Sequence, residues 1–245
     1  MKLICALTLL SVSWVHGQQQ PQSTEDPQQQ LLDAYRRTLM DWGGLTYYGS
    51  EDAELKLKSG AGRVVFLGDE IFEEWGKGKK PFFAGKPYVN RGIRRQTAAQ
   101  MLVRFRQDVI ELHPEVVVIE AGSNDIAGTM GPASEATIAD QIKSMFELAQ
   151  THKIRVVLAS VLPVCDCFEQ KQTARRSPVR ILGLNGWMKG YAKETGATYL
   201  DFYAALANGR NMKRELTVDG HLPNDAGYEV MDGLAEKAIA AALTK

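Results

Sequence analysis

Short apolar runs alternate with amphipathic stretches along most of the chain. Stretches that place apolar residues three and four positions apart predict helices at 97–112, 134–150, 179–195 and 225–244. Five runs rich in β-branched residues predict strands: RVVFLG (63–68), YVN (88–90), EVVVIEAG (115–122), IRVVLASVLP (154–163) and TYLDFY (198–203). Nearly continuous apolar strands separated by helices predict an α/β fold with a parallel sheet that is covered on both faces.

The first sixty residues follow a different pattern. Residues 1–17, MKLICALTLLSVSWVHG, place one Lys before an apolar stretch too short to span a bilayer, which is typical of a secretory signal peptide. Residues 18–30 are dominated by Gln and offer almost nothing to bury, so we expect a disordered tether. Residues 31–59 begin with a helix, LLDAYRRTLMDW, and continue as a loop to a domain at 60–245. We therefore expect a secreted or periplasmic protein whose mature form has no membrane span.

Charge and cysteine content narrow the partners. The 29 basic and 29 acidic residues cancel, so nothing favours nucleic acid or an anionic membrane surface as a partner. Cys165 and Cys167, spaced CDC, are interpreted as two free or loosely paired loop thiols, because a bridge across one residue is strained. No second ligand pair accompanies them, so zinc is not expected, and no cofactor is predicted.

The polar residues that could carry chemistry lie in four loops. Ligands of a parallel sheet bind at the carboxyl ends of its strands. Three loops follow the first three predicted strands, and a fourth precedes the last helix: GDE (68–70), NRGIRRQT (90–97), AGSND (121–125) and VDGHLPND (218–225).

In their order, these four stretches resemble the motifs of the SGNH hydrolase superfamily, the GDSL-type esterases and lipases. The resemblance covers about residues 60–245 and implies a flavodoxin-like, three-layer α/β/α sandwich with a five-stranded parallel sheet. It also implies a Ser nucleophile in the GDS turn and an Asp-x-x-His pair near the carboxyl terminus. The oxyanion hole would combine an Asn side chain with backbone N–H groups of the Ser and of a second-block Gly.

Two functional positions keep the residues that the resemblance requires. Asn124, in a GSND motif with Gly122, stands at the position of the oxyanion Asn. Asp219 stands at the position of the triad Asp. In the second block, Gly92 is interpreted as an ordinary turn glycine.

Three other positions depart from the pattern. Glu70 stands where the Ser nucleophile is expected, and Arg95 stands at the oxyanion Gly. Leu222 stands where the base is expected, while His221 lies one position early. We expect none of these residues to perform the family's role. Loss of one triad member typically lowers turnover by about 10⁴ to 10⁶, so ordinary esterase activity is not expected.

Three functions remain open from the sequence. The favoured one is a secreted, catalytically impaired relative that keeps a pocket for a small acyl or sugar ligand. The second is an active acyl-ester or carbohydrate-ester hydrolase in which Glu70 acts as base or nucleophile, supported by His221, Asp219 and Asn124. The third is a metal- or carbohydrate-binding module built from Asp69, Glu70, Asp219 and His221, although their spacing has no metal signature.

For Glu70 we expect an ion pair with Arg95, or failing that with Arg94, which fills the former oxyanion hole. The resemblance implies that the nucleophile and the second-block Gly face each other, and here both residues are long and oppositely charged. Either charge alone would stand uncompensated in a partly desolvated cleft. A carboxylate oxygen should then lie within roughly 4 Å of a guanidinium nitrogen.

Overall fold

The computed structural model describes residues 26–245, which form two compact units divided after Met40. The first unit contributes helix α1 (Pro27–Met40). The predicted signal peptide and residues 18–25 of the predicted tether lie outside the described residues. Residues 27–30 are helical, so the tether boundary at residue 30 is wrong. Pro27 suits the first position of a helix, and Asp26 accepts a hydrogen bond from the backbone N–H of Gln28 at 3.0 Å.

The second unit, Asp41–Lys245, is built on a five-stranded parallel sheet with the strand order β2-β1-β3-β4-β5. This confirms the predicted α/β class and its five parallel strands. The strands are β1 (Val64–Gly68), β2 (Tyr88–Gly92), β3 (Val116–Glu120), β4 (Arg155–Ala159) and β5 (Thr198–Leu200). A separate short hairpin joins β6 (Ala207–Asn208) to β7 (Asn211–Met212).

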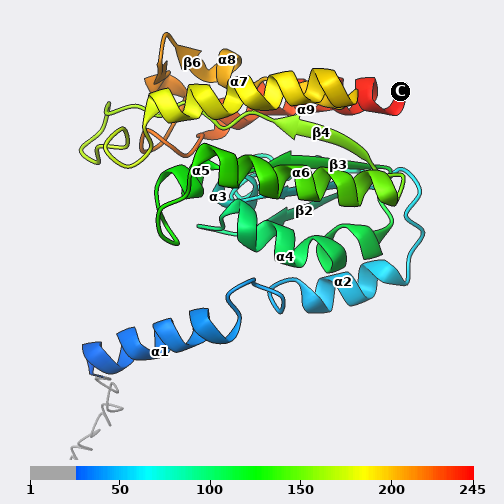
Figure 1. Cartoon of the computed structure of the whole chain (residues 1–245), viewed down its shortest axis with the longest axis horizontal. Coiled ribbons are helices and arrows are strands. Elements are labelled where there is room, and N and C mark those ends of the chain that lie inside the picture. Colours follow the sequence, from blue (N-terminus) through cyan, green and yellow to red (C-terminus); the bar gives the residue numbers. More distant parts are fainter. Residues whose placement is uncertain (1–25) are drawn as a thin grey trace, which may run out of the picture. The chain divides into compact units, whose positions relative to one another are not determined.

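Helices cover both faces of this sheet and make the predicted three layers (Figure 1). These helices are α3 (Glu70–Glu73), α4 (Ala98–Asp108), α5 (Ser123–Ile126), α6 (Glu135–Thr151), α7 (Pro178–Thr195), α8 (Phe202–Leu206) and α9 (Asp225–Leu243). Side chains of β1 alternate between the two cores: Val65 and Leu67 pack with α4, α6 and α7, while Val64 and Phe66 pack with α3, α8 and α9. Within the described part of the chain, no helix is long and apolar enough to cross a membrane.

Three predictions on this unit are corrected. The loop expected up to residue 59 contains helix α2 (Gly49–Lys56), and the compact unit begins at Asp41 instead of residue 60. Helix α2 lacks an apolar stripe; its buried Asp52 instead pairs with the guanidinium of Arg91, with 2.6 Å between Oδ1 and Nη2. The last strand ends at Leu200, because the side chain of Asp201 accepts from the backbone N–H of Ala204 and starts α8.

The two cysteines outside the predicted signal peptide are bonded to each other. Cys165 and Cys167 form a disulfide with their Cα atoms 5.3 Å apart, which lies within the range that disulfides span. The interpretation of free or loosely paired thiols is therefore wrong. The bridge lies in the loop that joins β4 to α7, which also lines the candidate site.

Candidate functional site

The four polar loops meet at the carboxyl edge of the sheet, as predicted. They surround a cleft of about 250 Å³, whose lining includes six residues of the predicted set: Glu70, Arg95, Asn124, Asp219, His221 and Leu222. Glu70 is the first residue of α3, directly after β1, and Asn124 lies in α5, after β3. Asp219 and His221 lie in the loop before α9.

The Glu70 carboxylate is the centre of this cleft. Its residue is only 5% exposed, and both of its oxygens accept hydrogen bonds. Oε2 accepts from the backbone N–H of Arg95 at 2.7 Å and from Nδ2 of Asn124 at 2.8 Å. Oε1 lies 3.2 Å from Nη2 of Arg176 and 3.1 Å from Nε2 of His221. Four donors therefore replace the water that this carboxylate loses on burial.

Arg95 takes part in a different way from the one predicted. Neither it nor Arg94 has a guanidinium within 4.0 Å of the Glu70 carboxylate, so the expected ion pair is wrong; Arg94 instead pairs with Glu73 and Glu74. Arg95 has a left-handed backbone, with φ of 66°, and contacts Glu70 through its backbone N–H. The family's Gly also acts through its backbone, so the expectation that Arg95 cannot supply this donor is wrong as well.

The guanidinium that pairs with Glu70 belongs to Arg176, in the loop between β4 and α7. Arg176 is 5% exposed and holds three neighbours besides Glu70. Its Nε donates to Oγ of Ser123 at 3.0 Å, its Nη1 to Oε1 of Gln172 at 3.3 Å, and its Nη2 to Oδ1 of Asn124 at 3.1 Å. The sequence does not mark this residue as functional, because an arginine pair in a loop has the same pattern as a solvated surface.

His221 and Asp219 do not form the pair that a catalytic triad needs. Oδ1 of Asp219 accepts from the backbone N–H groups of His221 at 2.8 Å and of Leu222 at 2.7 Å, so the carboxylate shapes the loop. The ring of His221 turns its Nε2 to Glu70, and its Nδ1 is buried without a hydrogen-bond partner among the described residues. Leu222, at the position of the base, cannot carry a proton.

The surroundings fix the charges of Glu70 and His221. Burial alone would raise the pKa of Glu70, but hydrogen bonds from His221, Asn124 and Arg95 outweigh it and hold the pKa below the usual value. Burial lowers the pKa of His221. At neutral pH the carboxylate is therefore ionised and the imidazole neutral. An ionised carboxylate accepts only, so Nε2 of His221 carries the ring proton.

A second acid pair lies directly beneath the cleft. Asp69 caps α3 by accepting from the backbone N–H of Ile71 at 2.9 Å, and it accepts from Nδ2 of Asn124 at 3.1 Å. Glu120, at the end of β3, is fully buried beside Asp69, and no Lys, Arg or His among the described residues forms an ion pair with it. Burial and the charge of Glu70 raise the pKa of Glu120 to about 7. Burial and the charges of Glu120 and Glu70 raise the pKa of Asp69 well above its usual value.

Two glycines allow the loops to approach this closely. Gly122 has φ of 118°, and a Cβ there would lie 2.4 Å from Cδ2 of Leu184. A Cβ on Gly92 would lie 2.1 Å from the backbone nitrogen of Glu73. Gly92 therefore ends β2 against α3, and the interpretation as an ordinary turn glycine is wrong.

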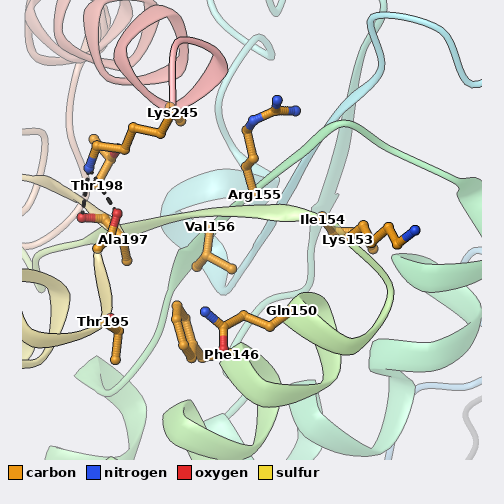
Figure 2. A pocket seen from close by; sticks show the side chains of 12 residues that line it. Phe146, Gln150, Lys153, Ile154, Arg155, Val156, Thr195, Ala197, Thr198 and Lys245 are labelled. Atoms are coloured by element: carbon orange, nitrogen blue, oxygen red, sulfur yellow. Dashed lines mark hydrogen bonds between the residues drawn. The ribbon is translucent and has the colours of Figure 1, made fainter.

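Other places on the molecule offer less chemistry. Among the described residues, no group of three or more His, Cys, Asp or Glu side chains could hold a metal ion, which leaves the metal-binding alternative without a site. A larger cavity of about 660 Å³ borders β4 and β5 (Figure 2). Its lining includes Lys153, Arg155 and Lys245 but no acid, histidine, serine or cysteine, and Nζ of Lys245 donates to the carbonyls of Gly196 and Ala197.

Comparison with known proteins gives consistent matches. Residues 66–230 match the model of the GDSL-like lipase/acylhydrolase family. A candidate acylhydrolase from Bacteroides fragilis is 38% identical, with a TM-score of 0.77, over 83% of this chain and 99% of that one. A GDSL-like lipase from Bacteroides thetaiotaomicron is 37% identical, with a TM-score of 0.77, over 82% of this chain and 98% of that one.

A curated relative matches over a shorter stretch. The Drosophila melanogaster homolog of platelet-activating factor acetylhydrolase IB subunit beta is 29% identical over 107 residues. The match covers 41% of this chain and 44% of that protein, so the chain spans less than half the length of this relative.

Proposed function

We propose that this chain, which belongs to the GDSL-like lipase/acylhydrolase family, binds a ligand without hydrolysing esters. One observation carries the proposal. The Glu70 carboxylate lies against the backbone N–H of Arg95 and Nδ2 of Asn124, at 2.7 and 2.8 Å. These groups correspond to two of the three oxyanion donors that the family resemblance implies, so a substrate carbonyl loses most of the stabilisation that its negative charge would need.

The remaining machinery supports the same conclusion. A carboxylate that accepts hydrogen bonds from four groups, with its pKa lowered, is both a weak base and a weak nucleophile. Leu222 occupies the position of the base, and Nε2 of His221 is already engaged with Glu70. Removal of single triad members elsewhere costs about 10⁴ or more in turnover.

A hydrolase with an altered site is the second candidate. The observation that favours it is the contact between Oε1 of Glu70 and Nε2 of His221, at 3.1 Å, beside an imidazole whose Nδ1 has no partner among the described residues. For catalysis, Glu70 would first have to leave both Arg176 and the oxyanion donors. Ester hydrolysis by the wild-type chain that depends on Glu70 would establish this candidate.

The experiment measures hydrolysis of p-nitrophenyl acetate and butyrate by the wild-type chain and a rebuilt variant. The rebuilt variant combines Glu70→Ser with His221→Leu and Leu222→His, which restores a nucleophile and places a base three residues after Asp219. We expect no wild-type turnover above background, and turnover at least about tenfold higher in the rebuilt variant, far below a natural triad's enhancement.

Two controls separate the explanations. A variant with only His221→Leu and Leu222→His restores the base but keeps Glu70 in the hole, so it should stay inactive. Wild-type turnover that disappears in Glu70→Ala would contradict the proposal and establish the altered hydrolase.

We also propose that the protein is exported and cleaved near Gly17, as the charge and apolar pattern of residues 1–17 indicate. Mass spectrometry of protein recovered from the medium or periplasm should then show a chain that begins near Gln18. An exported chain that still carried Met1 would contradict this.

A further inference from the structure

The cleft above Glu70 has more positive than negative side chains. Two acids, Glu70 and Asp219, are among the residues that line it. Four arginines line it as well: Arg94, Arg95, Arg175 and Arg176. The one histidine in the lining, His221, is neutral because burial lowers its pKa. The charges of the lining therefore sum to an excess of cations.

Ion pairs neutralise only two of these arginines. Arg176 pairs with Glu70, and Arg94 pairs with Glu73 and Glu74 beside the cleft. Arg95 and Arg175 are exposed, and neither has a carboxylate within 4.0 Å among the described residues. Burial lowers the pKa of Arg176 and the charge of the neighbouring Arg175 lowers it further, whereas the charges of Glu70, Asp69 and Asp219 raise it. An anion between these groups would relieve the repulsion.

The rest of the lining suits a hydrophilic ligand. Thr129, Gln170 and Gln172 supply hydroxyl and amide groups, and Leu222 is the single apolar side chain in the lining. An alkyl chain would therefore bury little apolar surface here. The volume of about 250 Å³ also lies below the usual range for drug-sized ligands, which indicates a small molecule.

We propose that this cleft binds a small hydroxyl-bearing organic anion, whose carboxylate, sulfate or phosphate group contacts the guanidinium groups of Arg95 and Arg175. Guanidinium groups bind such oxyanions through paired, charge-assisted hydrogen bonds. The ligand's hydroxyl groups would contact the amide and hydroxyl side chains of the lining. This inference rests on the proposed function, because a hole already filled by Glu70 leaves the outer cleft for the ligand.

The test is isothermal titration calorimetry at low ionic strength with four probes of similar size. Glucuronate, glucose 6-sulfate and glucose 6-phosphate carry the three anionic groups, and glucose is the neutral reference. We expect at least one anion to bind at least about tenfold more tightly than glucose. The preferred anion identifies which of the three groups the cleft recognises.

Two variants locate the site. Arg175→Ala and Arg95→Asn should each weaken binding of that anion by about tenfold or more. Asn is chosen at position 95 because it tolerates the left-handed backbone found there. Arg210→Ala is the matched control, since it removes one exposed arginine outside the cleft, and it should leave affinity unchanged.

Three results would overturn the inference: no measurable anion binding, equal binding of glucose, or equal weakening by the control variant. The same samples are assayed for ester turnover. Wild-type turnover would refute the proposed function alone, whereas the titrations decide the ligand class.

Discussion

At the scale of single residues, the position of Glu70 depends on a partner that is distant in sequence. Glu70 and Arg176 have side chains that are each 6% exposed, and 3.2 Å separates Oε1 from Nη2. Either charge left alone in the cleft would keep the cost of desolvation without the attraction that offsets it.

A double-mutant cycle tests this pair. Glu70→Gln and Arg176→Met should each lower the free energy of unfolding by about 2 to 4 kcal/mol, because each leaves the other charge without its partner. The double variant should lose at least about 1 kcal/mol less than the sum of the two. Urea denaturation measures all three.

A parallel cycle of Glu70→Gln with Arg95→Asn is the control. It should show a coupling energy near zero, since Arg95 contacts Glu70 through its backbone. Equal coupling energies in both cycles would contradict the assignment of Arg176 as the partner.

Sequence reasoning identified most of the cleft's residues but not their contacts. Glu70, Asn124 and His221 each follow or precede a recognisable element, so strand ends alone bring them together. Arg176 has no such signal, because the loop after β4 has no periodicity. The predicted role of Arg95 was wrong, because the prediction considered its side chain. The backbone N–H that donates to Glu70 does not depend on the type of side chain.

At the scale of elements, the ends of strands are held by buried polar side chains, which the hydrophobic pattern of the sequence predicts to be exposed to solvent. Arg104, in α4, is fully buried. Its Nη2 donates to the carbonyls of Gly68, at the end of β1, and Arg91, in β2, at 3.1 and 2.8 Å. Its Nη1 pairs with Asp108 at 2.8 Å. Helix α4 therefore holds together the two strands that lead to Glu70 and Arg95, although its period predicted only an apolar face.

The buried acid at the end of β3 makes stability depend on pH. The pKa of Glu120 rises from 4.5 to about 7 on folding, so the folded state binds its proton more tightly than the unfolded state. The free energy of unfolding should therefore fall as pH rises from about 4.5 to about 7. Glu120→Gln should reduce this fall, leaving the part that is due to Asp69, and stabilise the protein at pH 8 by on the order of 2 kcal/mol.

Urea denaturation at pH 5 and pH 8 checks the expectation. Glu147→Gln, an exposed acid on α6, is the matched control and should leave the pH dependence as it is in the wild type. A wild-type pH dependence retained in Glu120→Gln would show that another group is responsible.

At the scale of the whole molecule, the alternation of strands and helices was sufficient to predict the layers. Each central strand is buried on both faces, so its apolar run is continuous and easily recognised. Helix α2 escaped prediction because it is held by the ion pair of Asp52 with Arg91, not by an apolar stripe. The predicted signal peptide lies outside the described residues, so export remains a prediction.

A carboxylate held by two of the oxyanion donors is also what an ester hydrolase would contain just after cleavage, before its acid product departs. This chain supplies such an acid from its own helix α3, so the molecule at rest resembles a permanent product complex. A tethered group acts at a high effective concentration, which a dissolved acid must exceed to displace it. Dissolved carboxylates are therefore expected to leave Glu70 in place, and ligand exchange is confined to the space outside it.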